Sequence, residues 1–323
     1  MRPASIGALG GCRCAGSATN AKPAEMASHA LPLKSCPGFV ITSSSAQIVS
    51  LMPSKKPLPG HSCPPKVSGG RLPSARRTDV DDVRTAICPW LTRSVVARVA
   101  GSLRHLDLGG LPILASDKTP DAALCVARDV VMHMLEQRPE LAGRLAEKKI
   151  RLAIMGATEL TTDIPDHSDL TPKDYWDKRA RGLGATLDRP AVSGAEENVL
   201  CYPTDVYRGE SILVHELSHA ILNIAVELFE PTMKTRVQAA YDAAIKAGLF
   251  ANTYAATNAD EYWAEGAQDW FDTNLTADPP NGVHNTIHTR AQLKAYDPGL
   301  AALLAEVFGD RPWRYACPPD QTP

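Results

Sequence analysis

The sequence predicts an α+β fold in which a small sheet precedes a mainly helical C-terminal part. Short runs of apolar and β-branched residues, separated by turn signals, are concentrated between residues 95 and 155. From Glu210 onward the pattern is strongly helical. Hydrophobic residues make up 44% of the 323 residues and charged residues 22%, which is typical of a globular protein with a sizeable core.

The N-terminal part of the chain has a net positive charge, and the remainder has a net negative charge. Residues 1–77 contain ten Lys or Arg residues and one acidic residue, Glu25, which leaves 24 basic and 35 acidic residues in the remainder. The first segment is rich in Ser, Pro, Gly and Ala, and it offers too little apolar surface to offset the entropy of ordering. We therefore expect residues 1–80 to form a disordered basic leader and residues 81–323 to form one folded domain.

The composition of the leader leaves its role open. An acid-poor, Ser-rich and basic segment matches an organelle transit peptide, and an unstructured extension or an upstream start codon explains it equally well. A secretory signal peptide is not indicated, because the apolar stretch at residues 6–11 is short and rich in glycine. Extracellular and organelle-targeted locations are both compatible with the sequence.

Composition also argues against two classes of partner. A net charge of −2 and an aromatic content of 6% do not favour a nucleic-acid-binding surface. No apolar run approaches the roughly 20 residues needed to span a bilayer, so we expect no integral membrane segment. The oligomeric state is left open.

The eight cysteines are divided equally between the leader and the rest of the chain. The later four form no Cys-x-x-Cys pair, which argues against a structural zinc ribbon; they are Cys88, Cys125, Cys201 and Cys317. Their wide separation permits one or two disulfides, and buried free thiols are equally compatible.

The first half of the folded domain is expected to alternate between strands and helices. Strands are predicted at residues 95–99, 111–114 and 150–155. One helix is predicted to begin at Thr119 as the capping residue, and a second to cover about 139–148. Residues 157–209 are expected to be irregular but ordered, with a short helix begun at Thr171. Within them, the Gly- and Pro-containing passage at residues 182–203 is expected to be functional or to form a binding rim.

Four helices are predicted in the second half, at residues 210–226, 231–247, 259–273 and 298–308. The first contains His215-Glu216-Leu217-Ser218-His219. Two histidines four apart lie on one helix face, so both rings can reach one metal ion. Glu216 can reach a water in an open coordination position and accept its proton, because Zn²⁺ lowers the pKa of such a water to about 7. The pattern predicts one zinc ion and a glutamate general base.

A third metal donor is predicted from a later helix. Leu222 and Ala225 stand where the metzincin pattern requires a glycine and a third histidine, so that class is excluded. Glu261 can complete a His₂Glu set. Glu265, one turn later, can accept the free ring N–H of a ligating histidine. The alternatives are a capping box between Asn258 and Glu261, and a surface charge at Glu265.

Together, these residues resemble the gluzincin metallopeptidases of the anthrax lethal-factor type. The resemblance covers roughly residues 211–273 and is carried by the two histidines, Tyr254, and Glu261-Tyr262-Trp263-Ala264-Glu265. It implies a zincin-like catalytic domain with Glu261 as third zinc ligand, Tyr254 as an aid to catalysis, and a peptide or protein substrate. A phenol near zinc can stabilise a developing oxyanion, and a half-buried aromatic residue without such a role is the alternative.

Two rival functions are a zinc hydrolase acting on a non-peptide amide and a non-catalytic, zinc-stabilised binding protein. The second is disfavoured because Glu216 has no purpose beside a closed metal site. His284 and His288 are further candidates, either for substrate contact or for a second metal pair, although a polar loop is favoured. For Asp166 and His167 we expect a solvated loop rather than a carboxylate–imidazole pair.

Overall fold

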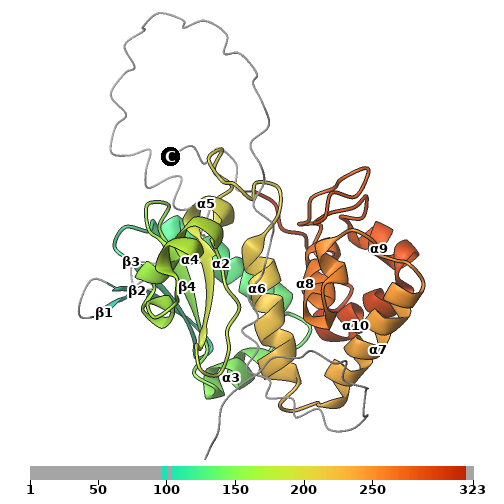
Figure 1. Ribbon diagram of the computed structural model, residues 1–323. Coiled ribbons are helices and arrows are strands. Elements are labelled where there is room, and N and C mark those ends of the chain that lie inside the picture. The colour runs from blue at the N-terminus through green and yellow to red at the C-terminus, as the bar shows by residue number, and fades with distance from the viewer. Residues whose placement is uncertain (1–96, 100–102, 318–323) are drawn as a thin grey trace, which may run out of the picture. The chain divides into compact units, whose positions relative to one another are not determined.

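The structure is a computed structural model that describes residues 97–99 and 103–317, all within one compact unit, Ala46–Pro323. The predicted leader at residues 1–80 and the predicted domain start at residue 81 lie outside the described residues. Among those described, no helix combines the length and apolarity needed to cross a membrane. The predicted mixture of a small sheet and a mainly helical C-terminal part is confirmed (Figure 1).

One five-stranded sheet forms the first half, with its strands in sequence order. The first three strands are antiparallel, and the last two continue the sheet in parallel. Gly109 and Gly110, with φ of +61° and +94°, make the tight turn of the β2–β3 hairpin, because glycine has no Cβ to oppose positive φ. The strands are β1 (Ala97–Val99), β2 (Leu103–Leu108), β3 (Leu111–Ser116), β4 (Arg151–Met155) and β5 (Ala191–Ala195).

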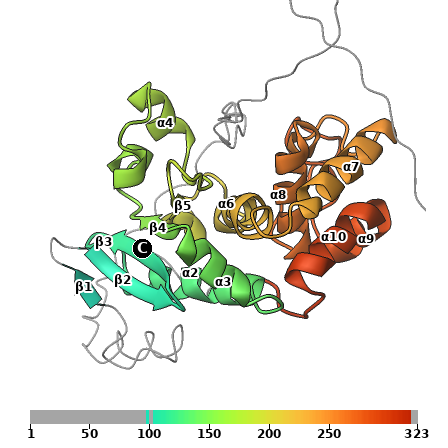
Figure 2. The same cartoon turned by 90° about the horizontal axis from the view of Figure 1, so that it is seen from below.

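The two faces of the sheet have different partners. The crossover from β3 to β4 contains α2 (Asp121–Met134) and α3 (Glu140–Glu147), which pack on one face (Figure 2). Residues alternate along β4, so Leu152 and Ile154 join the main core, whereas Ala153 and Met155 pack with Ile164 on the other face.

The predicted cap of α2 is wrong. The residue before the helix is Pro120, which makes no side-chain cap, and the Thr119 hydroxyl instead donates to the Ile154 carbonyl at 3.2 Å. Thr119 is fully buried, so its hydroxyl joins the helix start to the sheet rather than to the helix itself.

Residues 157–209, predicted to be irregular, contain a strand that the sequence did not indicate. Between β4 and β5 lie η1 (Thr161–Asp163), η2 (Pro165–His167) and α4 (Lys173–Arg179), and β5 is followed by the short α5 (Glu196–Val199). The predicted solvated loop at residues 166–167 is also wrong. His167 is 1% exposed, and Asp166 pairs with Arg151.

The C-terminal part is helical, and α6 lies between β5 and α8 (Figure 2). A π-helix, η3, directly continues α6, so the single helix predicted at 210–226 changes its hydrogen-bond pattern at Ile221. The elements are α6 (Ile212–Ala220), η3 (Ile221–Val226), α7 (Thr232–Lys246), η4 (Tyr254–Ala256), α8 (Ala259–Trp270), α9 (Arg290–Tyr296) and α10 (Pro298–Phe308).

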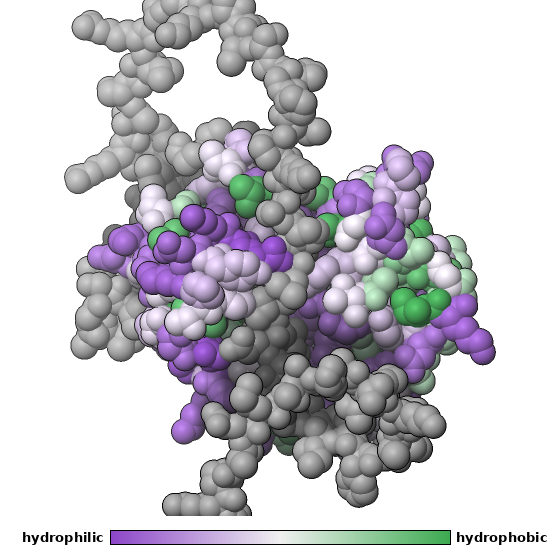
Figure 3. Space-filling view, viewed as in Figure 1, coloured by the Kyte–Doolittle hydropathy of each residue, from purple (hydrophilic) through white to green (hydrophobic). Residues whose placement is uncertain are grey.

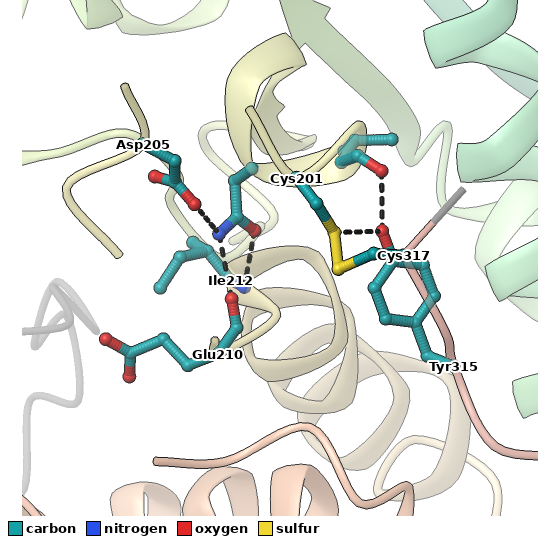
Figure 4. Close-up of a disulfide and its surroundings, with 8 residues drawn as sticks. Cys201, Asp205, Glu210, Ile212, Tyr315 and Cys317 are labelled. Atoms are coloured by element: carbon teal, nitrogen blue, oxygen red, sulfur yellow. Dashed lines mark hydrogen bonds between the residues drawn. A yellow bond between two sulfur atoms is a disulfide. The ribbon is translucent and has the colours of Figure 1, made fainter. Parts of the chain in front are cut away.

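A disulfide between Cys201 and Cys317 ties the chain after α5 to the C-terminal segment (Figure 4). The Tyr315 hydroxyl donates to the Val199 carbonyl at 2.5 Å beside it. Cys125, which is fully buried, is also disulfide-bonded. Disulfides therefore form, which answers for these three residues a question that the sequence left open.

The view in Figure 3 shows hydrophilic residues over much of the described surface, with apolar residues in separate small groups. The large apolar side chains that are exposed come from several segments of the chain: Met132, Leu160, Tyr175, Leu187, Val206, Leu228, Phe229 and Ile245. Such scattered exposure is ordinary for a protein surface.

Candidate metal centre

The start of α6 is fixed by two side chains. Ser211 Oγ accepts the Val214 N–H at 3.3 Å. Asn198 Oδ1 accepts the N–H of Ile212, labelled in Figure 4, at 2.9 Å. These contacts satisfy donors that a helix N-terminus leaves without intrahelical partners. All nine residues of α6 are buried. Packing against the sheet and α8 therefore fixes the position of His215, one turn into the helix.

A similar cap fixes Glu261 on α8. Asn258 Oδ1 accepts the Glu261 N–H at 2.9 Å, which places Glu261 in the first turn. Its carboxylate does not complete a capping box but lies against the histidines of α6. The cap and the histidine contact that the sequence offered as alternatives therefore occur together, one through the backbone and one through the side chain.

Three donor atoms from α6 and α8 form a small triangle. His215 Nε2 is 3.1 Å from Glu261 Oε2 and 3.2 Å from His219 Nε2, and the third side, between His219 Nε2 and Glu261 Oε2, is 3.5 Å. Zinc bonds of 2.0–2.1 Å in a tetrahedron imply donor separations of about 3.3 Å. The residues present therefore fit a zinc ion, and this group could hold a metal.

The tautomer of His215 supports the same conclusion. Its Nδ1 is 2.9 Å from Gln268 Oε1 and 3.4 Å from Glu265 Oε1, and both neighbours are acceptors, so Nδ1 carries the ring hydrogen. In the neutral ring, Nε2 then points a lone pair at the Glu261 carboxylate. Two lone pairs of like polarity face each other at 3.1 Å, and a cation between them removes this repulsion.

The pKa values of His215 and Glu261 also indicate that positive charge stabilises this group of side chains. Burial lowers the pKa of His215, but the hydrogen bond with Glu261 and the nearby carboxylates outweigh it and raise the pKa to about 10. Burial raises the pKa of Glu261, yet His219 and His215 outweigh it and hold that pKa well below its usual range. Without a metal the centre recruits a proton, and zinc can take that proton's place.

Glu216 lies beside the triangle and is 1% exposed. Burial raises the pKa of its carboxyl, and His215 and His219 lower it. Gly184 packs against this carboxylate, since a Cβ added there would lie 3.3 Å from Glu216 Oε2. Among the residues that the structure describes, Glu216 Oε2 has no hydrogen-bond partner.

Glu265 is 3% exposed, so the alternative of a surface charge is wrong. Burial raises its pKa to about 7, and one of its oxygens accepts a hydrogen bond from Asn274 at 3.2 Å. The predicted acceptor for a ring N–H is in place, but Gln268 is the nearer partner of His215. Gln268 was missed, although it lies seven residues after Glu261 and hence on the same face of α8.

Tyr254, in η4, is 4% exposed. The alternative of a half-buried aromatic residue is therefore wrong about its burial. Its ring lies 6.3 Å from the His215 ring, centroid to centroid, with 27° between the planes. The Tyr254 N–H donates to the Val283 carbonyl at 2.8 Å, which fixes the backbone at this point. The tyrosine thus lies next to the metal centre, and its role in catalysis stays a prediction.

The structure does not bring His284 and His288 into the triangle. His284 is 4% exposed, and its Nε2 is 3.6 Å from Glu210 Oε2. It lines a cavity of about 10 Å³, the size of one water, together with Glu265 and Asn274. His288 is half-buried, with Nδ1 3.3 Å from the Thr286 carbonyl. Both lie in a loop, as expected, and their contact with substrate stays a prediction.

A larger cavity lies elsewhere. It has a volume of about 330 Å³ and is lined by residues of β3, β4 and the turns after β4, including Leu114, Met155 and Ile164. None of the predicted site residues lines it, so it belongs to the other face of the sheet and not to the metal centre.

Comparison of the chain with protein-family models, with curated proteins and with solved structures finds no match. The chemistry of this centre is therefore inferred from its own geometry.

Proposed function

We propose that the protein is a zinc metallopeptidase with a zincin-like catalytic domain. One observation carries the proposal: two histidines of α6 and a glutamate of α8 converge to within 3.5 Å, and the buried carboxylate of Glu216 lies beside them. A set of three protein donors leaves one tetrahedral position for water or substrate, which is the arrangement of catalytic rather than structural zinc sites.

In this proposal His215, His219 and Glu261 hold the ion. Zinc, when bound, polarises a carbonyl and lowers the pKa of a coordinated water to about 7. Glu216 accepts a proton from the attacking water and delivers it to the leaving nitrogen. Tyr254 donates a hydrogen bond to the oxygen of the carbonyl as negative charge develops there. Gln268 and Glu265 keep the His215 ring in the orientation that points Nε2 at the metal.

The two rival functions differ from this one in the fourth coordination position and in the substrate. Among residues 97–99 and 103–317, the candidate metal group contains three donor residues and no fourth, which disfavours a closed structural site. Glu216 is also buried beside the group at a cost in desolvation, and a purely structural site has no use for it. Hydrolysis of a non-peptide amide would use the same residues and is distinguished by substrate.

The substitution Glu216→Gln tests the proposal in the full chain. Glutamine keeps the shape but cannot accept a proton, so cleavage of an unbiased peptide library should fall at least about 10²-fold while zinc content stays at the wild-type level. Glu227→Gln, one residue beyond η3 and paired with Lys234 at 3.3 Å, is the control and should change neither.

Other outcomes select a rival. Full activity of Glu216→Gln would rule out this residue as the base. Hydrolysis of non-peptide amides with no peptide cleavage would favour the first rival. A zinc-loaded wild-type chain that hydrolyses neither substrate class, but loses thermal stability on zinc removal, would favour the binding protein.

A further inference from the structure

We propose that Ser193 and His167 position Glu216 for catalysis through the backbone of residues 182–184, a proposal that rests on the peptidase function proposed above. Neither side chain reaches the metal centre. Each acts by fixing a short segment of chain that lies against β5 and α6 and packs against the Glu216 side chain. We call residues 182–184 the clamp segment.

The clamp segment lies directly against α6 at the level of the proposed base. A Cβ added at Gly182 would meet Ile212 Cγ2 at 2.5 Å and the Ser193 carbonyl oxygen at 2.9 Å. A Cβ at Gly184 would lie 3.3 Å from Glu216 Oε2. Glycine at 182 is therefore needed for this close approach, since any side chain would push the segment away from the helix.

Ser193 holds the clamp segment at two points. Its backbone N–H donates to the Leu183 carbonyl at 2.8 Å, and its side-chain oxygen accepts the Leu183 N–H at 3.0 Å. Both peptide groups of one residue are thus bonded to a single residue of β5. The next residue along the segment, Gly184, is the one that packs against the Glu216 carboxylate. A shift at Leu183 is therefore passed directly to this contact with Glu216.

His167 sets the direction of the Ser193 hydroxyl. Its Nε2 is 3.0 Å from Ser193 Oγ, and the two residues are 1% and 0% exposed. Among the described residues, His167 Nδ1 has no hydrogen-bond partner. If Ser193 donates to Nε2, one buried polar group is left unpaired. If Nε2–H donates to Ser193, both Nδ1 and the hydroxyl hydrogen are unpaired, which costs more.

The first arrangement leaves the hydroxyl oxygen free to accept the Leu183 N–H. It requires a neutral His167, and burial lowers the pKa of this ring, which favours that state. The chain of contacts therefore runs from His167 through Ser193 and Leu183 to Gly184 and the carboxylate. This organisation holds the clamp segment against the Glu216 side chain.

A matched control distinguishes the positioning of Glu216 from a merely structural role of these buried hydrogen bonds. Ser193→Ala removes the acceptor of the Leu183 N–H. Thr119→Val likewise removes a buried hydroxyl bonded to a main-chain group of the sheet, the Ile154 carbonyl, but it has no contact with the clamp segment among those described. Both variants should lose similar stability, and only the first should disturb Glu216.

The experiment measures amide hydrogen exchange and steady-state kinetics on the full-length chain. In Ser193→Ala, exchange of peptides spanning residues 182–186 should become at least about tenfold faster, with or without zinc. Its kcat should fall about 10- to 100-fold with little change in KM, because Glu216 is displaced while substrate binding is unaffected. Thr119→Val should show neither effect, and zinc content should stay at one ion per chain in both.

A second pair of variants covers the case in which Ser193→Ala does not fold. His167→Leu removes the acceptor of the hydroxyl and should show the same faster exchange and lower kcat, whereas His167→Gln offers a carbonyl oxygen and should restore both in part. Equal exchange and equal kcat in Ser193→Ala and Thr119→Val would overturn the proposal, as would faster exchange with unchanged kcat. A wild-type chain without hydrolytic activity would instead defeat the proposed function, and the exchange measurement would still decide whether the clamp exists.

Discussion

The ring of His215 is held in one orientation by its neighbours. Gln268 Nε2 donates to the Ser211 carbonyl at 3.3 Å, so its amide oxygen is turned to His215 Nδ1. This contact determines which ring nitrogen carries the hydrogen and leaves Nε2 as the donor atom for the metal. Ser211 also caps α6, so the same turn of chain fixes both the helix and the tautomer.

Gln268→Leu tests this account of His215. Leucine keeps the volume but removes the acceptor, so zinc affinity should fall about 10- to 100-fold, the usual effect of losing a partner of a metal-binding histidine. Gln238→Leu on α7, where the native amide donates to Asp242, is the control. Competition with a chelator of known affinity measures both. Equal zinc affinity in Gln268→Leu and wild type would mean that Glu265 alone suffices to orient the ring.

At the scale of elements, a carboxylate joins α3 to the end of the helix that carries His215 and His219. Glu230, between η3 and α7, accepts hydrogen bonds from Arg144 of α3 at 2.7 Å and from Arg138 at 3.0 Å. Arg144 also donates to the Ala225 carbonyl of η3. The hydrogen bonds of Arg138 and Arg144 lower the pKa of Glu230 to about 2.

The stabilisation by Glu230 should depend on pH in a defined direction. Its pKa is lower in the folded state than the ordinary value of 4.5, so the contribution is complete above about pH 4.5 and is lost as pH falls toward 2. Glu230→Gln should therefore reduce the free energy of unfolding by about 1 kcal/mol at pH 7, and by less at pH 3. Denaturant unfolding at the two pH values measures this.

Glu306→Gln is the matched control for that prediction, since Glu306 pairs with Arg236 in a more exposed position. It should have the smaller effect at pH 7. A destabilisation by Glu230→Gln that is the same at pH 3 and pH 7 would show that charge is not the cause.

The helices that carry the three candidate donors could be predicted, because spacing along one helix is a local property. The residues of other segments that pack around the site could not be predicted. β5 is composed of Ala, Val, Ser, Gly and Ala, a run with weak strand propensity. It becomes a strand because it pairs with β4 in the sheet. Gly184 meets Glu216, and Ser193 meets Leu183, only through contacts between segments distant in sequence. Gln268 was within reach of sequence reasoning, since it repeats the face of Glu261 two turns later.

Helix boundaries show the same division. The helix predicted at residues 259–273 ends at Trp270, and Asp272 has φ of +56°, which an α-helix cannot accommodate. The change to a π-helix at Ile221 has no local sequence signal, and the structure gives no single contact that explains it.

At the scale of the whole described chain, the C-terminal segment ties together regions on both sides of the metal centre in sequence. The disulfide joins Cys201 to Cys317, 116 residues apart, and this span includes His215, His219 and Glu261. Trp313 stacks on His133 of α2 at 4.5 Å. The segment between Cys201 and the end of the described chain is therefore closed into a loop, which restricts the unfolded chain and favours the folded arrangement of α6 and α8.

The central claim is that His215, His219 and Glu261 together hold one zinc ion, and zinc binding by the full-length chain tests it most directly. Metal content and a chelator-competition titration should give one tightly bound zinc per wild-type chain. Glu261→Ala, folded as judged by its circular dichroism, should bind zinc at least about 10²-fold more weakly, because it removes one of three protein donors. A wild-type chain that binds no zinc, or a Glu261→Ala variant with wild-type zinc content and affinity, would contradict the account.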